Sequence, residues 1–284
     1  MKEADFIAAL AALAGDPAAR RLRDDAAVIE LGGERLILTH DTLVQGVHVR
    51  EDEDPADIAW KLVAVNLSDL AAKGAEPVGV LIGHMLGNGD ERFVEGLRAV
   101  LSEFDLPLLG GDTVRAEGRR VWGCTAIGRA TSNPVPDRRG AKAGDAVYVT
   151  GTLGRAMLGF EAPEGEHGPA YRRPVPRLAE GCALAPIVTA MMDISDGLLL
   201  DCWRLAEASG TRIELASEVI PVADPARRAE CLRWGDDYEL LFTAPSELPL
   251  PVEATRIGTV SDAGPALLLD GRALSNADGL GYSH

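Results

Sequence analysis

Residues Asp54–Leu86 read DPADIAWKLVAVNLSDLAAKGAEPVGVLIGHML, and they predict a long helix that leads into a strand. Asp54 is a suitable helix N-cap, and Pro55 fits the first helical turn, where a missing N–H group is tolerated. The helical pattern continues to about Lys73 and ends at Gly74, a residue type that readily terminates helices. Because the helix is so apolar, we expect other parts of the protein to cover most of it.

Helices and strands alternate in the predictions for the rest of the chain. An amphipathic helix comes first, and a Gly-Gly turn joins the first two strands. The predicted strands are Ala26–Glu30, Arg35–Thr39, Val78–Leu86, Leu106–Leu109, Val121–Arg129, Ala146–Thr150, Arg212–Leu215, Tyr238–Thr243 and Arg256–Val260. The further predicted helices are Asp90–Phe104, Arg155–Phe160, Pro176–Ala190 and Leu198–Ser209, with a loose segment before Arg173. This alternation indicates an α/β or α+β fold.

A linker is predicted near the middle of the chain. Thr131–Gly144 is rich in proline, glycine and arginine, which is typical of a connecting segment. A chain of 284 residues commonly forms two domains. We therefore expect an N-terminal domain over residues 1–135 and a C-terminal α/β domain over residues 136–284.

The overall charge and composition exclude some classes of partner. The chain has 28 Lys and Arg residues against 44 Asp and Glu residues, a formal net charge of −16. No basic stripe offsets this charge, so we expect no nucleic-acid partner. No apolar run approaches the ~18 residues of a membrane span, and the acidic, alanine-rich start does not resemble a signal peptide. The four cysteines are widely spaced, as in reduced cytosolic proteins, so a cytoplasmic location is expected.

Four apolar runs each lead to an aspartate that is followed by a turn or helix-start residue. They are LILTHDT (Leu36–Thr42), AVNLSDL (Ala64–Leu70), LLGGDT (Leu108–Thr113) and MMDISDGL (Met191–Leu198). A single run of this kind is typical of a turn or a helix cap. Four of them, with few basic residues nearby, indicate carboxylates gathered around divalent cations such as Mg²⁺, which proteins often bind together with substrate phosphates. The pattern therefore points toward phosphate chemistry.

Several of these acidic residues also have a structural explanation. Asp69 shares a helix face with Asn66 and Lys73, which is compatible with a solvent-facing polar stripe. If the helix is covered, Asp69 needs either an ion pair with Lys73 or a bound cation. Asp24 and Asp25 stand just before the first strand, where they fit a capped turn as well as a metal site.

Two segments are candidates for contact with a phosphate group. Gly110–Thr113 reads as a tight turn whose backbone amides could approach a phosphate, with Asp112 available to a metal ion, although such turns are common. Ser195 and Asp196 open a helix, and a helix start favours anions; Asp193 and Asp196 are equally compatible with caps. The chain contains no P-loop, no spaced G-x-G-x-x-G fingerprint and no protein-kinase motif set. A bound nucleotide would therefore need a different architecture.

Six segments, taken in order, add a more specific signal. They are DTLVQGVH (Asp41–His48), AVNLSDLAAKGAEP (Ala64–Pro77), GGDT (Gly110–Thr113), RRGAKAGD (Arg138–Asp145), DISDGL (Asp193–Leu198) and GDDYELLF (Gly235–Phe242). Together they resemble the thiamine-monophosphate kinase family, in the superfamily that includes aminoimidazole ribonucleotide synthetase. The resemblance extends from about Asp24 to Tyr282. It implies a two-domain synthetase-like fold and a homodimer whose N-terminal sheets form a shared barrel, with ATP near the interface.

The resemblance also implies a set of ligand-binding residues. Several Mg²⁺ ions would be bound by Asp25, Thr39, Asp41, Asp69, Asp112, Asp193 and Asp196. ATP would be contacted by Gly111, Asp112, Arg138 and Ser195, and thiamine monophosphate by His48, Asp236 and Tyr282. Asp236 is one methylene shorter than the Glu that is common in the family, so its direct contact is in question. At position 40, His replaces a small hydroxyl residue, so we expect at most a backbone contribution there.

The implied reaction transfers a phosphoryl group from ATP to thiamine monophosphate and yields ADP and thiamine diphosphate. The accepting phosphate is largely ionised near neutral pH, since the second pKa of a phosphate monoester is about 6. No general base is therefore expected, and none is conspicuous in the sequence. Two rival hypotheses stay open: a synthetase that acts on a purine precursor through the same nucleotide site, and a nucleotide-binding regulator without turnover.

Overall fold

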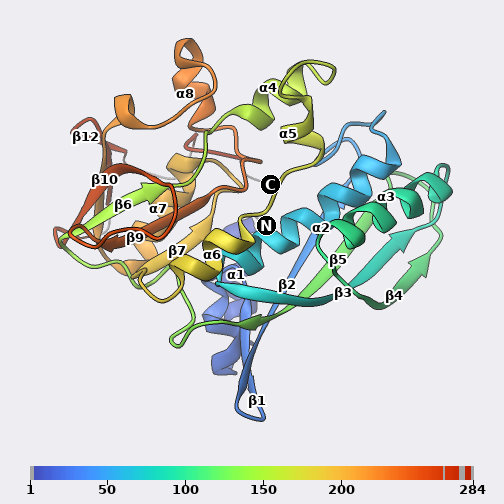
Figure 1. Ribbon diagram of the computed structural model, residues 1–284, viewed down its shortest axis with the longest axis horizontal. Coiled ribbons are helices and arrows are strands. Elements are labelled where there is room, and N and C mark those ends of the chain that lie inside the picture. The colour runs from blue at the N-terminus through green and yellow to red at the C-terminus, as the bar shows by residue number, and fades with distance from the viewer. Residues whose placement is uncertain (1–2, 265, 275–278, 283–284) are drawn as a thin grey trace.

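The computed structural model describes residues 3–264, 266–274 and 279–282, and it contains one β-sheet from each half of the chain (Figure 1). In spatial order, the N-terminal sheet consists of β1 (Ala27–Leu31), β2 (Glu34–Val44), β5 (Val121–Ala130), β3 (Ala75–Met85) and β4 (Leu108–Val114). The C-terminal sheet consists of β12 (Arg272–Leu274), β11 (Ala266–Leu269), β8 (Arg212–Leu215), β10 (Thr255–Ser261), β6 (Asp145–Val149), β9 (Leu240–Pro245) and β7 (Ala190–Asp193). Both sheets mix parallel and antiparallel pairs, and with their helices they confirm the predicted mixed α/β class.

Helices connect the strands in both halves. The α-helices are α1 (Glu3–Ala11), α2 (Pro55–Ala72), α3 (Asp90–Glu103), α4 (Arg155–Glu161), α5 (Gly168–Arg172), α6 (Leu178–Leu184), α7 (Leu198–Ser209) and α8 (Arg228–Cys231). Short 3₁₀ helices are η1 (Pro17–Leu22), η2 (Ser217–Val219) and η3 (Pro225–Arg227). Within the described ranges, none of these helices is both long and apolar enough to cross a bilayer.

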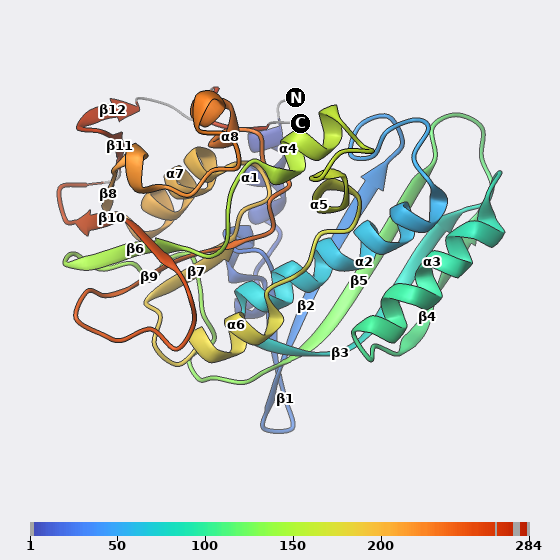
Figure 2. The same ribbon diagram turned by 45° about the horizontal axis from the view of Figure 1, so that its top comes forward.

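Helix α2 runs through the middle of the molecule, between the two sheets (Figure 2). One side packs on β2 and β5 beside α3, and the other side contacts α5, α6 and β7. The Asp54 carboxylate accepts a hydrogen bond from the amide of Ala56 at 2.9 Å, and Gly74 follows the helix with a φ of 56°, so both predicted ends are confirmed. Asn66 and Lys73 are fully buried, which excludes the solvent-facing polar stripe.

Among the described residues, helices cover only one face of the N-terminal sheet. Helices α2 and α3 pack on the face that carries Trp122, Cys124 and Ala126. On the opposite face His40 and Leu81 are exposed, and every residue of the edge strand β4 is exposed as well. The sheet is open, with β1 and β4 at its edges, so the described part of a single chain does not close a barrel.

The structure corrects several of the element predictions. Gly110–Thr113, predicted as a tight turn, is extended within β4. The helix predicted over Pro176–Ala190 ends at Leu184, and Ala190 begins the buried strand β7. The segment before Arg173 is not entirely loose, because it contains α5, and the sequence patterns do not predict β11 and β12. All of these elements are short, and hydrophobic periodicity does not distinguish short helices from short strands.

Candidate active site

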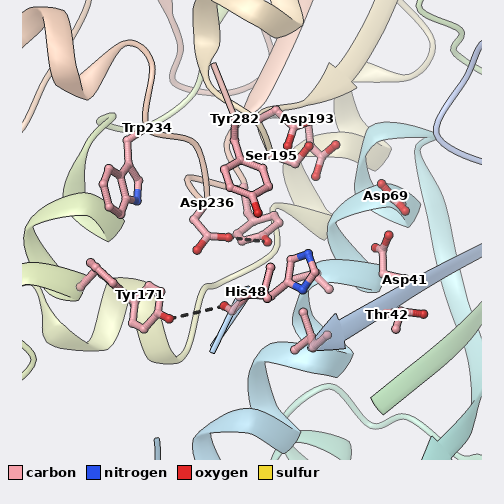
Figure 3. A pocket seen from close by; sticks show the side chains of 16 residues that line it. Asp41, Thr42, His48, Asp69, Tyr171, Asp193, Ser195, Trp234, Asp236 and Tyr282 are labelled. Carbon is pink, nitrogen blue, oxygen red and sulfur yellow. Dashed lines mark hydrogen bonds between the residues drawn. The ribbon is translucent and has the colours of Figure 1, made fainter. Parts of the chain in front are cut away.

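A cavity of about 500 Å³ lies between the end of β2, helix α2 and loops of the C-terminal half (Figure 3). Asp41, Asp69 and Asp193 lie on one side of it, while Tyr171 and Trp234 lie on the other. The predicted site residues that line the cavity are Asp41, His48, Asp69, Asp193, Ser195, Asp196, Asp236 and Tyr282. The fold therefore brings residues from both halves of the sequence to one cavity with an acidic and an aromatic side.

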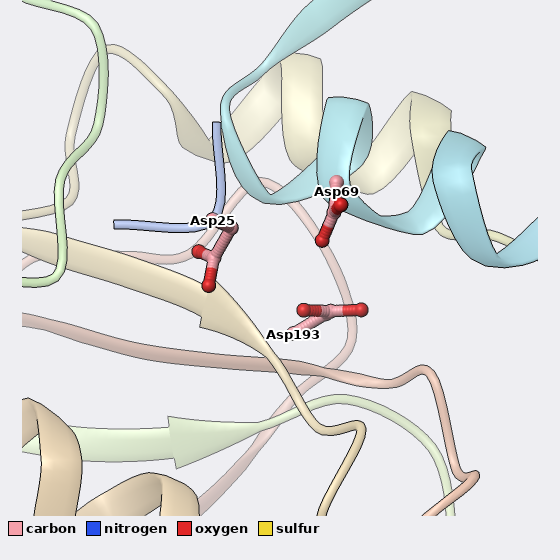
Figure 4. Close-up of side chains that lie close together, drawn as sticks. All are labelled: Asp25, Asp69 and Asp193. Atoms are coloured by element: carbon pink, nitrogen blue, oxygen red, sulfur yellow. The ribbon is translucent and has the colours of Figure 1, made fainter. Parts of the chain in front are cut away.

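Next to the acidic side, three carboxylates from three separate segments of the chain form a compact cluster (Figure 4). Asp25 precedes β1, Asp69 belongs to α2 and Asp193 ends β7, and carboxylate oxygens of all three lie within 4.8 Å of one another. The Thr39 hydroxyl donates a hydrogen bond to Asp69. The Ser68 hydroxyl donates one to Asp193 at 2.6 Å. These hydroxyl groups orient the carboxylates of the cluster.

Basic residues compensate one end of this cluster. The fully buried Lys73 ammonium forms ion pairs with Asp24 and with Asp25, the latter at 2.8 Å. Arg138, predicted to contact ATP, forms an ion pair with Asp25. Burial raises the pKa of Asp24, but the nearby charges of Lys73 and Arg20 outweigh this effect and lower it overall. Asp25 is thus paired with two cations, whereas Asp41, Asp69 and Asp193 form no ion pair among the described residues.

The carboxyl groups nearer the cavity have raised pKa values. Burial, and then the charge of Asp196, raises the pKa of Asp41 to about 6. Burial raises the pKa of Asp193 to about 6 as well, although the Ser68 hydrogen bond opposes this shift. The pKa of Asp69 is raised well above its usual value by burial and by the charges of Asp41 and Asp193. A divalent cation would relieve this repulsion and favour the ionised carboxylates, so the donor set fits Mg²⁺.

The loop before α7 is fixed by contacts to other parts of the C-terminal half. The Asp196 carboxylate accepts a hydrogen bond from Arg204 at 2.5 Å, and the Asp196 amide donates to Asp201 at 3.1 Å. The Ser195 carbonyl accepts a hydrogen bond from the amide of Asp236 at 2.8 Å. The Asp196 carbonyl accepts one from the amide of Tyr282 at 2.9 Å. These bonds hold three separate loops against one another at the cavity wall.

The other side of the cavity is aromatic, with one acidic group. Phe160 and Trp234 lie with their ring centroids 5.3 Å apart, and Phe160 makes an edge contact with Tyr171 at the same distance. The Asp236 carboxylate accepts a hydrogen bond from the Tyr238 hydroxyl at 2.8 Å. His48 accepts one at Nδ1 from the amide of Val44 at 3.0 Å, which fixes the orientation of the ring.

Tyr238, predicted to begin a strand, precedes β9 instead. Its φ is 51° and that of Asp236 is 58°, so both residues adopt the left-handed conformation. Non-glycine residues adopt this conformation infrequently, and such residues are enriched at functional sites. The irregular backbone places both side chains at the cavity.

Asp112 is not part of this cluster within one chain. In the sheet register, Asp112 pairs with Gly83, Gly83 with Gly123, and Gly123 with Thr42. Paired residues face the same side of a sheet, and Thr42 alternates with Asp41, so Asp112 projects from the face opposite to Asp41. Asp112 and its neighbour in β4, Gly111, therefore lie on an edge strand, away from the other predicted ligands of the same chain.

Comparison with known proteins identifies the family. Models of the AIR synthase related protein match residues 23–130 with the N-terminal domain and residues 142–265 with the C-terminal domain. The chain is 39% identical over 252 residues to the thiamine-monophosphate kinase of Caulobacter vibrioides, an alignment that covers 80% of this chain and 72% of that protein. The chain belongs to the thiamine-monophosphate kinase family.

Further members of the thiamine-monophosphate kinase family cover more of the chain. The Escherichia coli K12 enzyme of that name is 35% identical over 301 residues, which cover 92% of this chain and 90% of that protein. The solved structure of AaThiL complexed with AMPPCP and TMP has a TM-score of 0.89 and 29% identity, and it covers 100% of this chain and 97% of that chain. The likeness therefore extends over both sheets.

Three charged residues near the cavity were not among those implied by the resemblance to thiamine-monophosphate kinases. Lys61 contacts Asp236, and Asp201 and Arg204 contact Asp196. Burial raises the pKa of Asp201 to about 7, with the Arg204 charge opposing and the Asp196 charge reinforcing this shift. Lys61 and Asp201 do carry a sequence signal, because each is a charged residue within an apolar stretch of a helix.

Proposed function

We propose that this protein transfers the terminal phosphoryl group of ATP to the phosphate of thiamine monophosphate and forms thiamine diphosphate. The observation that carries the proposal is the two-sided cavity, in which the carboxylates of Asp41, Asp69 and Asp193 face aromatic side chains. The relatives in Caulobacter vibrioides and Escherichia coli carry the name of this activity, and the AaThiL structure is a complex with AMPPCP and TMP.

The aromatic side of the cavity suits the organic part of thiamine monophosphate. Thiamine carries a flat aminopyrimidine and a cationic thiazolium ring, and aromatic faces bind both kinds of group. Tyr171, Trp234 and Tyr282 supply such faces, and Asp236 supplies a negative charge. His48 lies between this side and the carboxylates, where it can contact the substrate near its phosphate. We assign His48 to substrate binding rather than to proton transfer.

The acidic side is proposed to bind several Mg²⁺ ions. The ligands of one chain would be Asp25, Thr39, Asp41, Asp69, Asp193 and Asp196. Bound Mg²⁺ would screen the repulsion between the phosphates of the two substrates. The hydroxyl of Ser68 keeps Asp193 oriented toward the cluster, and Arg204 does the same for Asp196.

Positioning, rather than proton transfer, is the task of the remaining residues. Phosphoryl transfer passes through a loose transition state and depends on the in-line arrangement of the donor and acceptor phosphates. Ser195 precedes α7, whose N-terminal amides favour an anion, and it is proposed to contact ATP together with Arg138. No residue is assigned as a general base, because the accepting phosphate oxygen is already ionised near neutral pH.

We extend the proposal to a homodimer, in which a second copy covers the open face of the N-terminal sheet. Leu81, Leu109 and Val121 are 36%, 51% and 40% exposed, and among the described residues the outer edge of β4 has no neighbouring strand. An uncovered apolar sheet face with an unpaired edge is a typical association surface. In such a dimer, Gly111 and Asp112 could reach the nucleotide site of the second copy. We also propose that the boundary between the two domains lies between residues 135 and 136 and that the protein is cytoplasmic.

The decisive experiment measures ADP release from ATP in the presence of Mg²⁺ and thiamine monophosphate. Thiamine diphosphate should form in a one-to-one ratio with ADP, and removal of Mg²⁺ with EDTA should abolish both. A parallel reaction with formylglycinamidine ribonucleotide should release no ADP above background. Release of ADP only with the purine precursor would replace the kinase proposal by the synthetase hypothesis, and ATP binding without turnover on either substrate would favour a regulator.

A further inference from the structure

Lys61 is a buried cation beside the cavity that the proposed reaction does not use. It belongs to α2 and is 1% exposed. Its ammonium group lies 2.6 Å from the Asp236 carboxylate, 3.3 Å from the carbonyl oxygen of His48 and 4.0 Å from the ring centre of Tyr171. A buried ammonium is strongly unfavourable unless charged or polar groups surround it, so these contacts define its position.

The partners of Lys61 come from three separate segments of the chain. His48 follows β2, Tyr171 belongs to α5 and Asp236 lies in the loop before β9. The Tyr171 hydroxyl also donates a hydrogen bond to the His48 carbonyl at 3.4 Å, as Figure 3 shows. Helix α2 is held between the two sheets. Its lysine therefore provides a fixed point that the three other segments contact.

The Asp236 carboxylate depends on this fixed point for its orientation. One oxygen accepts from Lys61 and the other accepts from the Tyr238 hydroxyl at 2.8 Å, so both oxygens are engaged. Its backbone φ of 58° shows that the loop holds this residue in an uncommon conformation. Without the ammonium group, one carboxylate oxygen would lose its charged partner, and the loop would lose its connection to α2.

We propose that Lys61 is the positioning residue for the thiamine-binding side of the cavity. It fixes the Asp236 carboxylate and joins the His48 and Tyr171 segments, which together form the wall opposite the acidic cluster. This inference rests on the proposed function, since it assumes that the organic part of thiamine monophosphate binds on that side. It predicts that Lys61 affects recognition of thiamine monophosphate much more than recognition of ATP.

The test compares Lys61→Met, which keeps the side-chain length but removes the charge, with the exposed-site control Lys142→Met. Loss of a charged hydrogen bond is commonly worth ~1.5–3 kcal/mol, so Lys61→Met should raise the KM for thiamine monophosphate about 10- to 100-fold. The KM for ATP should change less than about threefold, and Lys142→Met should match the wild type. Equal changes in both KM values, or none, would overturn the positioning role.

A double-mutant cycle with Asp236→Asn separates positioning from general destabilisation. Once Asp236 is neutral, removing the Lys61 charge should add little, so Lys61→Met/Asp236→Asn should have nearly the same KM for thiamine monophosphate as Asp236→Asn alone. The double variant removes the charges of both partners, so the ammonium and the carboxylate are not left unpaired, which keeps the test usable if Lys61→Met does not fold. Independent, multiplying effects would contradict the inference. A wild-type enzyme that does not turn over thiamine monophosphate would contradict the proposed function itself.

Discussion

At the scale of single residues, Asp41 is the most direct test of the carboxylate cluster. It lines the cavity, and burial together with the Asp196 charge raises its pKa to about 6. We expect Asp41→Asn to lower kcat by about 100-fold or more, because the amide keeps the shape but removes the negative charge that a cation requires. Steady-state kinetics at saturating ATP and thiamine monophosphate would measure this effect.

The fold should tolerate the same substitution. Replacing a half-buried, poorly compensated carboxylate by a neutral amide removes an unfavourable charge, so the melting temperature of metal-free Asp41→Asn at about pH 8 should be equal to or above that of the wild type. The exposed Asp262→Asn serves as the control and should change neither quantity. Near wild-type kcat in a folded Asp41→Asn protein would argue against the metal-binding role.

The raised pKa values also predict how pH controls metal binding. Asp41 and Asp193 each have a pKa of about 6 in the folded protein, above the usual 3.8, so they hold protons more tightly when folded. Their contribution to metal-free stability is therefore fully present below about pH 4 and is lost as the pH rises through about 6. Mg²⁺ must displace these protons, so saturating MgCl₂ should raise the melting temperature clearly at about pH 8 and much less at about pH 5.

Differential scanning calorimetry with and without MgCl₂ at both pH values measures this prediction. Asp193→Asn should reduce the stabilisation by MgCl₂ at about pH 8, since one ligand is missing. Equal stabilisation of the wild type at the two pH values would mean that the cation binds elsewhere.

The sequence predicted most of these residues because each ligand has a local signature. Asp41 and Asp193 both follow apolar runs, and the runs are indeed the strands β2 and β7. Whether ligands meet is decided by strand pairing, which is not encoded locally, and this is why Asp112 faces away from Asp41. Lys61 escaped the prediction for the same reason, since its partner Asp236 is far away in the sequence.

At the scale of elements, the contact between α2 and α3 shows how closely the central helix is packed. Gly96 of α3 faces α2, and an added Cβ atom would lie 2.2 Å from the carbonyl oxygen of Ala56. Gly96→Ala should gain up to about 1 kcal/mol in helix propensity but lose more to overpacking, which typically costs 1–3 kcal/mol. We therefore expect a net decrease in the free energy of unfolding of about 1–2 kcal/mol.

Urea denaturation of Gly96→Ala would measure this decrease. Gly15→Ala is a matched control, because an added Cβ atom there has no neighbour within 4 Å. A more stable Gly96→Ala protein would show that the two helices can separate slightly at no cost. The long, apolar α2 was predictable with both of its ends, whereas β7 was not predicted as a strand, because three apolar residues followed by an aspartate are too few to show a diagnostic period.

At the scale of the whole molecule, the two sheets occupy separate halves of the chain, and residues of both halves line the cavity. The sequence predicts this division from the linker composition and the alternating elements. It does not show how the open face of the N-terminal sheet is covered, because no helix or strand in the described part of the chain packs there. Asp112 also lies away from the carboxylate cluster of its own chain. The proposed homodimer would explain both observations, because a second copy would cover the open face and bring Asp112 near a cluster.

The final prediction tests whether one active site uses two copies of the chain. Asp41→Asn and Asp112→Asn proteins should each be nearly inactive as homodimers. Suppose that each site combines Asp41 of one copy with Asp112 of the other. A mixed dimer then contains one site with both native aspartates and one site with both substitutions. After equal amounts are unfolded and refolded together, about half of the dimers are mixed, so activity should recover to about a quarter of the wild type.

The control mixes Asp41→Asn with Asp193→Asn. Asp41, Asp69 and Asp193 line one cavity of a single chain, so in this mixture every site that the mixed dimers contain carries one substitution and no activity should return. Light scattering should give a mass of about twice 30.0 kDa for each preparation. If the Asp41→Asn and Asp112→Asn mixture stays inactive while mixed dimers form, Asp112 must act within its own chain, and the sheet register makes that possible only after a large rearrangement of β4.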